Sequence, residues 1–109
     1  MTLNFDDFRT ANVDRQKEWD PDDKITLTYR ATELAGELGE ACNVIKKLER
    51  ERLGIRGTRD TKEHLAEELA DVIICVDLLA MSAGIDLGAS VRNKFNATSE
   101  KYGLVTRIA

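Results

Sequence analysis

The sequence predicts an all-α protein, a bundle of four to five helices that assembles into a dimer or a dimer of dimers. Apolar residues recur at helical spacing, and no segment alternates as a half-buried strand does. One proline and 6% aromatic residues among 109 favour helices over a β-sandwich or barrel. Residues 72–80 (VIICVDLLA) are apolar on nearly every side, so we expect other subunits to cover them.

The bulk composition sets the class of protein. The length of 1–109 fits one domain, and 42% apolar with 33% charged residues is ordinary for a globular protein. A net charge of −4 argues against a nucleic-acid partner, and no apolar run is long enough to cross a membrane. The acidic N-terminus lacks the apolar region of a secretory signal, so a cytoplasmic location is expected. Cys42 and Cys75 lack metal or redox spacing and are predicted to be reduced, helix-packing residues; a disulfide is the alternative.

The first predicted helix runs from about residue 4 to 19 and ends at the DPDD segment, where proline stops one helix and aspartates can cap the next. Its apolar residues lie loosely on one side: Phe5, Phe8, Ala11 and Val13. The second helix is long, from about 24 to 53. Its apolar positions near helical spacing are Ile25, Leu27, Ala31, Leu34, Leu38, Ala41, Ile45 and Leu48.

The third and fourth helices follow a glycine-punctuated loop at 54–60. Asp60 or Thr61 is expected to cap the third helix, which runs to about residue 83 before the stop at Gly84. Asp86 is predicted to cap the fourth helix, from 87 to about 102. Asp77, inside the apolar run, is expected to be hydrogen-bonded within or between subunits.

Residues 33–42 (ELAGELGEAC) combine two features that weaken a helix. Each interior glycine costs about 1 kcal/mol relative to alanine. Glutamates three or four residues apart also repel one another. At 100° per residue, Glu33, Glu37 and Glu40 share one narrow stripe. The third helix carries its own acidic stripe, which holds Glu67, Glu68, Asp71, His64 and Cys75.

Two facing acidic stripes would repel each other without a positive charge between them. Carboxylate oxygens are the ligands of hard divalent cations, so the stripes predict Mg²⁺, with Mn²⁺ as an alternative. Gly36 and Gly39 flank Glu37, where they would let a helix or a substrate approach the backbone closely. The competing interpretation is a solvated surface, the usual place of glutamate.

Two acidic motifs together resemble a known family. Glu37-x-x-Glu40 is followed, after 27 intervening residues, by Glu68-x-x-Asp71. The segments GELGE (36–40), EELADVIICVDLLA (67–80) and KFNATSEKY (94–102) are similar to the metal helices and C-terminal substrate motif of MazG-like all-α nucleoside triphosphate pyrophosphohydrolases. The resemblance implies a hydrolase that cleaves a nucleoside triphosphate to monophosphate and pyrophosphate, controlling or cleaning the nucleotide pool. It also implies that these four acids bind magnesium and are the catalytic residues. The same resemblance implies a homodimer or homotetramer with its sites near subunit interfaces.

Substrate-binding residues are expected outside the acidic motifs. Where many relatives have asparagine and arginine in the last motif, this chain has Thr98 and Ser99, and Asn96 is the candidate replacement. The lysines are candidates for phosphate contacts, and the aromatic residues for the base, sugar or phosphate. The full set is Lys94, Lys101, Tyr102, Lys47, Asn43 and Trp19. Solvated lysines, and packing roles for the two aromatic residues, are the alternatives.

Several roles stay open at this stage. Glu33 or Glu67 would orient the attacking water or support the metal ligands; the alternative for each is an exposed surface glutamate. His64 is a ligand or, more simply, a polar residue of the helix start. A redox di-metal bundle is disfavoured because it needs Glu-x-x-His on each of two helices, and there is one histidine. The other rival is a non-catalytic helical dimerisation or interaction module related to the family.

Overall fold

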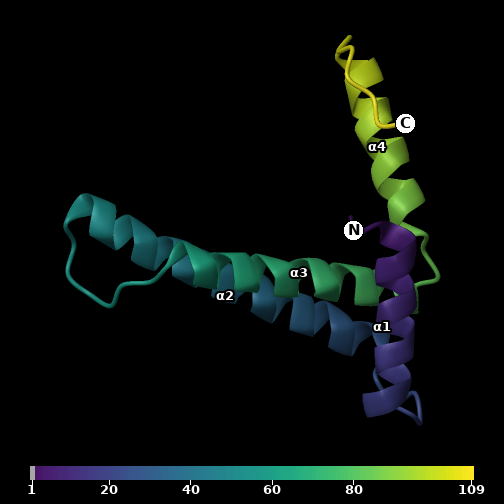
Figure 1. Cartoon of the computed structure of the whole chain (residues 1–109), viewed down its shortest axis with the longest axis horizontal. Helices are drawn as coiled ribbons and strands as arrows, with labels where there is room; N and C mark the ends of the chain where they lie inside the picture. Colours follow the sequence, from purple (N-terminus) through teal and green to yellow (C-terminus); the bar gives the residue numbers. More distant parts are fainter. Residues whose placement is uncertain (1) are drawn as a thin grey trace.

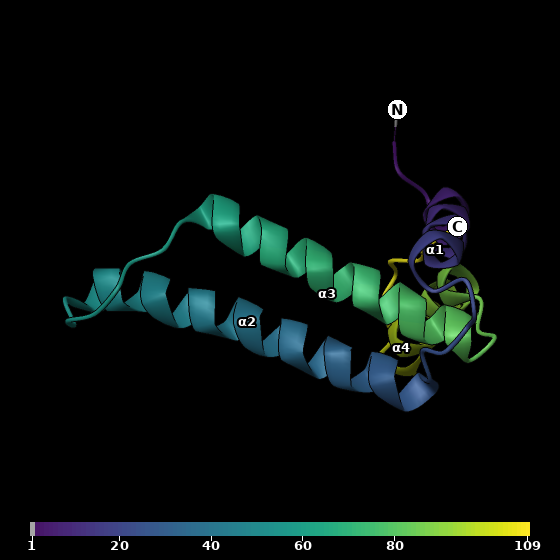
Figure 2. The ribbon, with the colours of Figure 1, turned by 90° about the horizontal axis from the view of Figure 1, so that it is seen from below.

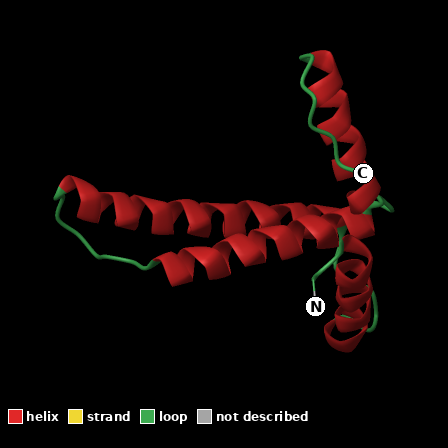
Figure 3. Ribbon diagram, turned by 45° about the horizontal axis from the view of Figure 1, so that its top comes forward, coloured by secondary structure: helices red, strands yellow, loops and turns green. Residues whose placement is uncertain are grey.

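The computed structural model describes residues 2–109, which form four α-helices and no strand. The helices are α1 (Phe5–Trp19), α2 (Leu27–Leu53), α3 (Lys62–Ser82) and α4 (Leu87–Lys101). Figure 3 shows that helices account for most of the chain and that the connecting segments are short. The all-α class predicted from the sequence is confirmed.

The helix boundaries follow from local capping. All four helices begin after a residue whose side-chain oxygen accepts a backbone N–H in the first turn: Asn4, Thr26, Thr61 and Asp86. The start of α2 lies three residues later than expected, because the Asp20 carboxylate accepts the backbone N–H groups of Lys24 and Ile25 and holds them in the turn. Gly54 ends α2 in the left-handed conformation, with φ 69°.

The long helices α2 and α3 form an antiparallel hairpin, and α1 and α4 cross it near one end (Figures 1 and 2). Helix α4 adjoins α1 and α3 and then projects away from the hairpin (Figure 1). Gly88 lies at this crossing, where an added Cβ would be 3.0 Å from the Phe5 Cβ. A larger residue there would require the Phe5 side chain to shift by a few tenths of an ångström.

The apolar core of the single chain is small. Its buried apolar residues all come from the hairpin: Ala41, Val44, Cys75, Leu78 and Ala80. The radius of gyration is 17.3 Å, whereas a closely packed domain of this length has about 13 Å. Within the apolar run of α3, the Ile73 side chain remains 53% exposed. The chain alone therefore leaves much of its apolar surface uncovered.

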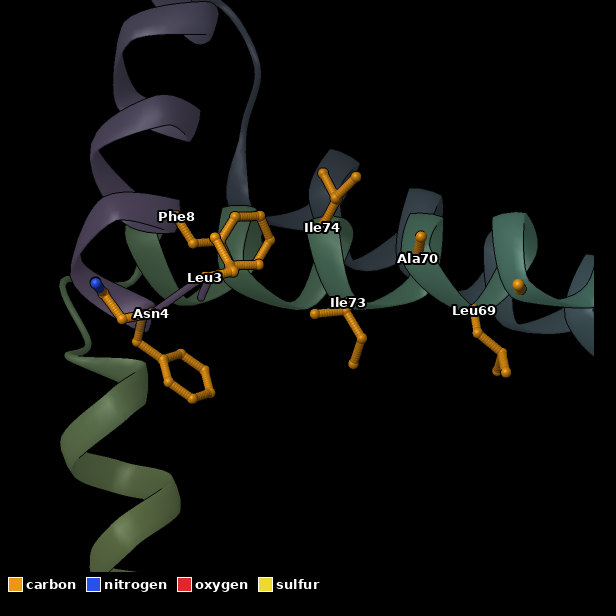
Figure 4. A pocket seen from close by; sticks show the side chains of 9 residues that line it. Leu3, Asn4, Phe8, Leu69, Ala70, Ile73 and Ile74 are labelled. Carbon is orange, nitrogen blue, oxygen red and sulfur yellow. The ribbon is translucent and has the colours of Figure 1, made fainter. Parts of the chain in front are cut away.

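An apolar groove of about 500 Å³ lies between the start of α1 and the outer face of α3. Figure 4 shows Leu3 and Phe8 on one side of it and Leu69, Ile73 and Ile74 along α3. The apolar residues along one side of α1 are exposed or half-buried. Its fully buried residues are polar, Asn12 and Gln16, because they bond to partners on other helices.

Asp77 is the anchor between α1 and α3. It is 1% exposed, and its carboxylate accepts hydrogen bonds from the Arg9 guanidinium at 3.0–3.2 Å and from Asn12 Nδ2 at 2.9 Å. The expectation that Asp77 is hydrogen-bonded is confirmed, and the partners belong to the same chain. Directional polar bonds rather than apolar packing therefore set the position of α1.

None of the four helices, taken singly, has the length and apolarity that a membrane crossing requires. The helices α3 and α4 satisfy the composition only as a pair, and the chain bends by 105° between them.

Candidate metal centre

Three carboxylates from the two arms of the hairpin converge. Glu37 and Glu40 lie one turn apart on α2, and Glu68 faces them from α3. Each offers a carboxylate oxygen, and the three oxygens lie within 4.8 Å of one another. The i, i+3 spacing puts the two α2 residues on one face, and the antiparallel packing brings α3 alongside. We call Glu37, Glu40 and Glu68 the acidic cluster.

The cluster is charged and partly shielded from water. The Oε2 atoms of Glu37 and Glu68 are buried and have no hydrogen-bond partner among the described residues. Burial raises the pKa of Glu37, and the negative charges of Glu40, Asp71 and Glu68 raise it further. Across residues 2–109, no lysine or arginine forms an ion pair with any of these four acids. The arrangement is electrostatically unfavourable for the protein alone.

The donor set fits a hard divalent cation. Buried carboxylate oxygens without partners are costly unless a positive group satisfies them. Two oxygens that bind one Mg²⁺ from opposite sides lie about 4 Å apart. Small side-chain rotations would bring the three carboxylate oxygens from their observed spacing to this distance. Asp71 is exposed, one turn after Glu68, and does not belong to the three-atom group, although its charge acts on Glu37. Its role as a ligand stays a prediction.

His64 holds Glu68 in place, a contact that the sequence analysis missed. Its Nε2 lies 2.9 Å from Glu68 Oε1 and its Nδ1 lies 2.7 Å from Asp60 Oδ1. The hydrogen bond to Asp60 raises the pKa of His64, and Glu68 adds to the shift. Lys47 pairs with the same Asp60 at 3.9 Å. The i, i+4 spacing of Asp60, His64 and Glu68 was the available signal.

Glu33 and Glu67 differ in their surroundings. Glu67 is exposed, whereas Glu33 is half-buried and its Oε1 accepts a hydrogen bond from the Cys75 Sγ at 3.7 Å. Burial raises the pKa of the Cys75 thiol to about 11, and the negative charge of Glu33 contributes. Both cysteines are free, as predicted, but Cys42 is exposed rather than packed against a helix of the same chain.

The two thiols should react with alkylating reagents at very different rates. The thiolate is the reactive species, and Cys75 is both buried and ionises only at high pH. Iodoacetamide at pH 8 should therefore modify Cys42 first, with Cys75 reacting only in denaturant. Mass spectrometry of peptides from a time course measures this order. Equal rates for both cysteines in the native protein would contradict the described environment of Cys75.

The C-terminal candidates lie apart from the cluster within one chain. Lys94, Lys101 and Tyr102 are exposed on α4 or at its end, and the Lys101 Nζ lies 5.4 Å from the centre of the Tyr102 ring. Because α4 projects away from the hairpin, a single chain does not bring these residues to the acids (Figure 1). Asn96 is occupied by the C-terminal tail, since its amide exchanges two hydrogen bonds of 2.8 Å with the Ile108 backbone. Their substrate roles stay predictions.

The remaining candidates lie on α2 and at the end of α1. Asn43 is exposed, and Trp19 is exposed beside a cavity that also has Glu33 in its wall. A Cβ added at Gly36 or Gly39 would meet nothing within 4 Å. No part of the described chain approaches these glycines closely, so any neighbour that needs the space comes from outside the chain.

Comparison with known proteins agrees with this geometry. The family model that matches is that of the MazG-like family, over residues 32–107, and this range contains all four acids of the two motifs. No curated protein and no solved structure matches. With most of its length matched, the chain belongs to the MazG-like family.

Proposed function

We propose that the protein hydrolyses nucleoside or deoxynucleoside triphosphates to the monophosphate and pyrophosphate, with Mg²⁺ (or Mn²⁺) as cofactor. The observation that carries the proposal is the acidic cluster, in which two buried carboxylate oxygens lack partners. Membership of the MazG-like family supports the same class of activity. An acidic face would repel a triphosphate, and only a bound cation reverses that field.

In this proposal Glu37, Glu40, Glu68 and Asp71 hold the metal. A bound divalent ion neutralises phosphate charge and lowers the pKa of a bound water. His64 occupies Glu68 Oε1 and leaves Oε2 unpartnered, so it orients this carboxylate for its ligand. Glu33, one turn before Glu37 on the same face, is the better placed residue to orient the attacking water, because Glu67 is exposed.

The phosphates also need cations, and we propose that they come from a second copy of the chain. Lys94 and Lys101 lie on α4, whose exposed face includes Val91 and Phe95. An isolated helix of this length is marginal in water, so an apolar face of α4 favours packing against another subunit. The large radius of gyration and exposed Ile73 support a homodimer or homotetramer. Lys47 is already paired with Asp60 and would contact the phosphates from the edge of the cluster.

A product assay tests the proposal. The protein, incubated with ribo- and deoxynucleoside triphosphates and Mg²⁺, should release pyrophosphate and a monophosphate. Removal of the ion with EDTA should stop the reaction, and excess Mg²⁺ should restore it, because the acids cannot act on a polyphosphate without a cation. Chromatography of the nucleotides and an assay for pyrophosphate give the readout. Release of orthophosphate and a diphosphate would contradict the proposed bond cleavage.

The competing function is a non-catalytic interaction module related to the family. The acidic cluster distinguishes the two, since a module has no need of unpartnered buried carboxylates. Thermal melting with and without Mg²⁺ separates them before any substrate is known. Binding to the native state raises the melting temperature, whereas solubilising acids would leave it nearly unchanged.

A further inference from the structure

A buried arginine without a carboxylate partner lies near the end of the hairpin where α1 crosses. Arg30 on α2 is 3% exposed, and its one side-chain hydrogen bond runs from Nη2 to Gln16 Oε1 on α1, at 3.0 Å. Gln16 is 7% exposed. The Arg30 Nε and the Gln16 Nε2 are both buried and have no acceptor among the described residues. Two N–H donors on touching side chains are thus left unpaired.

Leaving buried donors unpaired is costly, so a native site of this kind points to an acceptor that is bound in use. Both residues form the wall of a cavity of about 220 Å³. Two aromatic side chains, Trp19 and Tyr29, also line it, and they are 61% and 56% exposed. Open aromatic rings beside buried donors suit a flat ring whose edge carries acceptors.

Arg30 and Gln16 also line a second, larger cavity, which includes Asp20 in its wall. Asp20 does not use the free donors: its oxygens accept the backbone N–H groups of Lys24 and Ile25. These bonds are the main reason that the pKa of Asp20 is lowered, and the charge of Arg30 adds to the effect. That cavity lacks exposed aromatic rings, so the smaller cavity is the better match for a planar ligand.

The position of the smaller cavity relates it to the acidic cluster. Glu33 is part of its wall and lies one turn before Glu37 on α2. At 1.5 Å per residue, Arg30 and Glu37 are about 10 Å apart along the helix, a span that a sugar and its first phosphate can bridge. A ring in the cavity would therefore place its phosphates toward the cluster.

We propose that this cavity binds the nucleobase of the substrate, and that Arg30 and Gln16 select bases whose edge presents two neighbouring acceptors. Cytosine (O2 and N3) and guanine (O6 and N7) have such an edge. Adenine and thymine interrupt it with a donor. This inference rests on the proposed function for the identity of the ligand as a nucleotide.

The only tryptophan of the chain gives a direct readout, because Trp19 lines the cavity. Its fluorescence is titrated with dCMP, dGMP, dAMP and dTMP in EDTA, so that metal binding plays no part. At least one of dCMP and dGMP should quench it at roughly 10-fold lower concentration than dAMP and dTMP, the discrimination typical of a bidentate base contact. The two favoured ligands also distinguish a one-ring from a two-ring pocket.

Gln16→Glu is the matched variant. The new carboxylate keeps an acceptor for Arg30, so the fold is retained, but it replaces the free donor by an acceptor. The preference for dCMP or dGMP should fall at least 10-fold. Arg30→Lys removes the Nε donor independently and should weaken binding of the same nucleotide. This second variant carries the test if Gln16→Glu has a low melting temperature. Lys17→Gln changes only the larger cavity and should leave the titration unchanged.

The outcomes are distinct from those of the proposed function. Equal quenching by all four bases, no quenching, or an unchanged preference in both Gln16→Glu and Arg30→Lys would overturn this inference even if pyrophosphate is released. Base-selective quenching without pyrophosphate release would overturn the hydrolase and leave the base cavity standing.

Discussion

Glu37→Gln is expected to reduce triphosphate hydrolysis roughly 100-fold or more and to raise the melting temperature of the metal-free protein. Loss of residues that merely support a metal ligand costs 10–100-fold, so loss of a ligand itself should cost at least as much. The stability gain has a separate cause: burial and the charges of Glu40, Asp71 and Glu68 disfavour ionised Glu37, and glutamine carries no charge. Initial rates with Mg²⁺ and thermal melts in EDTA measure the two effects.

The two readouts together make this test specific. The wild-type melting temperature should rise on addition of Mg²⁺, and Glu37→Gln should remove most of that rise. Glu51→Gln is the matched control, because Glu51 is an exposed glutamate of the same helix without a side-chain partner among the described residues. A variant at Glu37 that behaves like the Glu51 control in both assays would contradict the candidate metal centre.

Asp77→Asn should destabilise the fold by about 3 kcal/mol. The aspartate is the most buried charged group described and receives bonds from Arg9 and Asn12. Asparagine removes the negative charge that pairs with Arg9. Its amide NH₂ group would also face either the Arg9 guanidinium or the Asn12 Nδ2, and both of these are donors. Urea denaturation followed by circular dichroism, at one protein concentration, measures the loss.

A double-mutant cycle with Arg9→Met separates the ion pair from other effects. Because both residues belong to one network, the double variant should lose less stability than the two single losses added together. Asp14→Asn, an exposed change on α1, should shift stability by less than about 0.5 kcal/mol. If Asp77→Asn is equally mild, α1 is not anchored to α3 through this group.

Much of the fold could be predicted from local signals. The four helices, the caps at Thr61 and Asp86 and the stop at Gly84 all follow from short-range chemistry that is visible in the sequence. The start of α2 was misplaced because the Asp20 carboxylate captures two backbone N–H groups, and nothing in helical periodicity reports such a turn. Local propensity defined the elements, but not which of their faces would be buried.

The burial of α1 shows this limit. Its apolar residues lie loosely on one side, yet Asn12 and Gln16 are the buried ones. Their partners, Asp77 and Arg30, are 65 and 14 residues away, so only the folded chain reveals the pairs. In the acidic cluster, helical spacing predicted Glu37 and Glu40 on one face, and the family resemblance added Glu68; the three lie together in the structure. The contact between His64 and Glu68 could have been predicted from their i, i+4 spacing, but the sequence analysis did not predict it.

The antiparallel hairpin has a consequence for how the protein would sense its environment. Its two arms each supply part of the acidic cluster. In the proposed function, a divalent ion held by the cluster would therefore link the two arms. Any opening of the arms that separates the ligands must release the ion. Under the proposed function, depletion of Mg²⁺ would then let the two arms separate more often and would stop the hydrolysis at the same time.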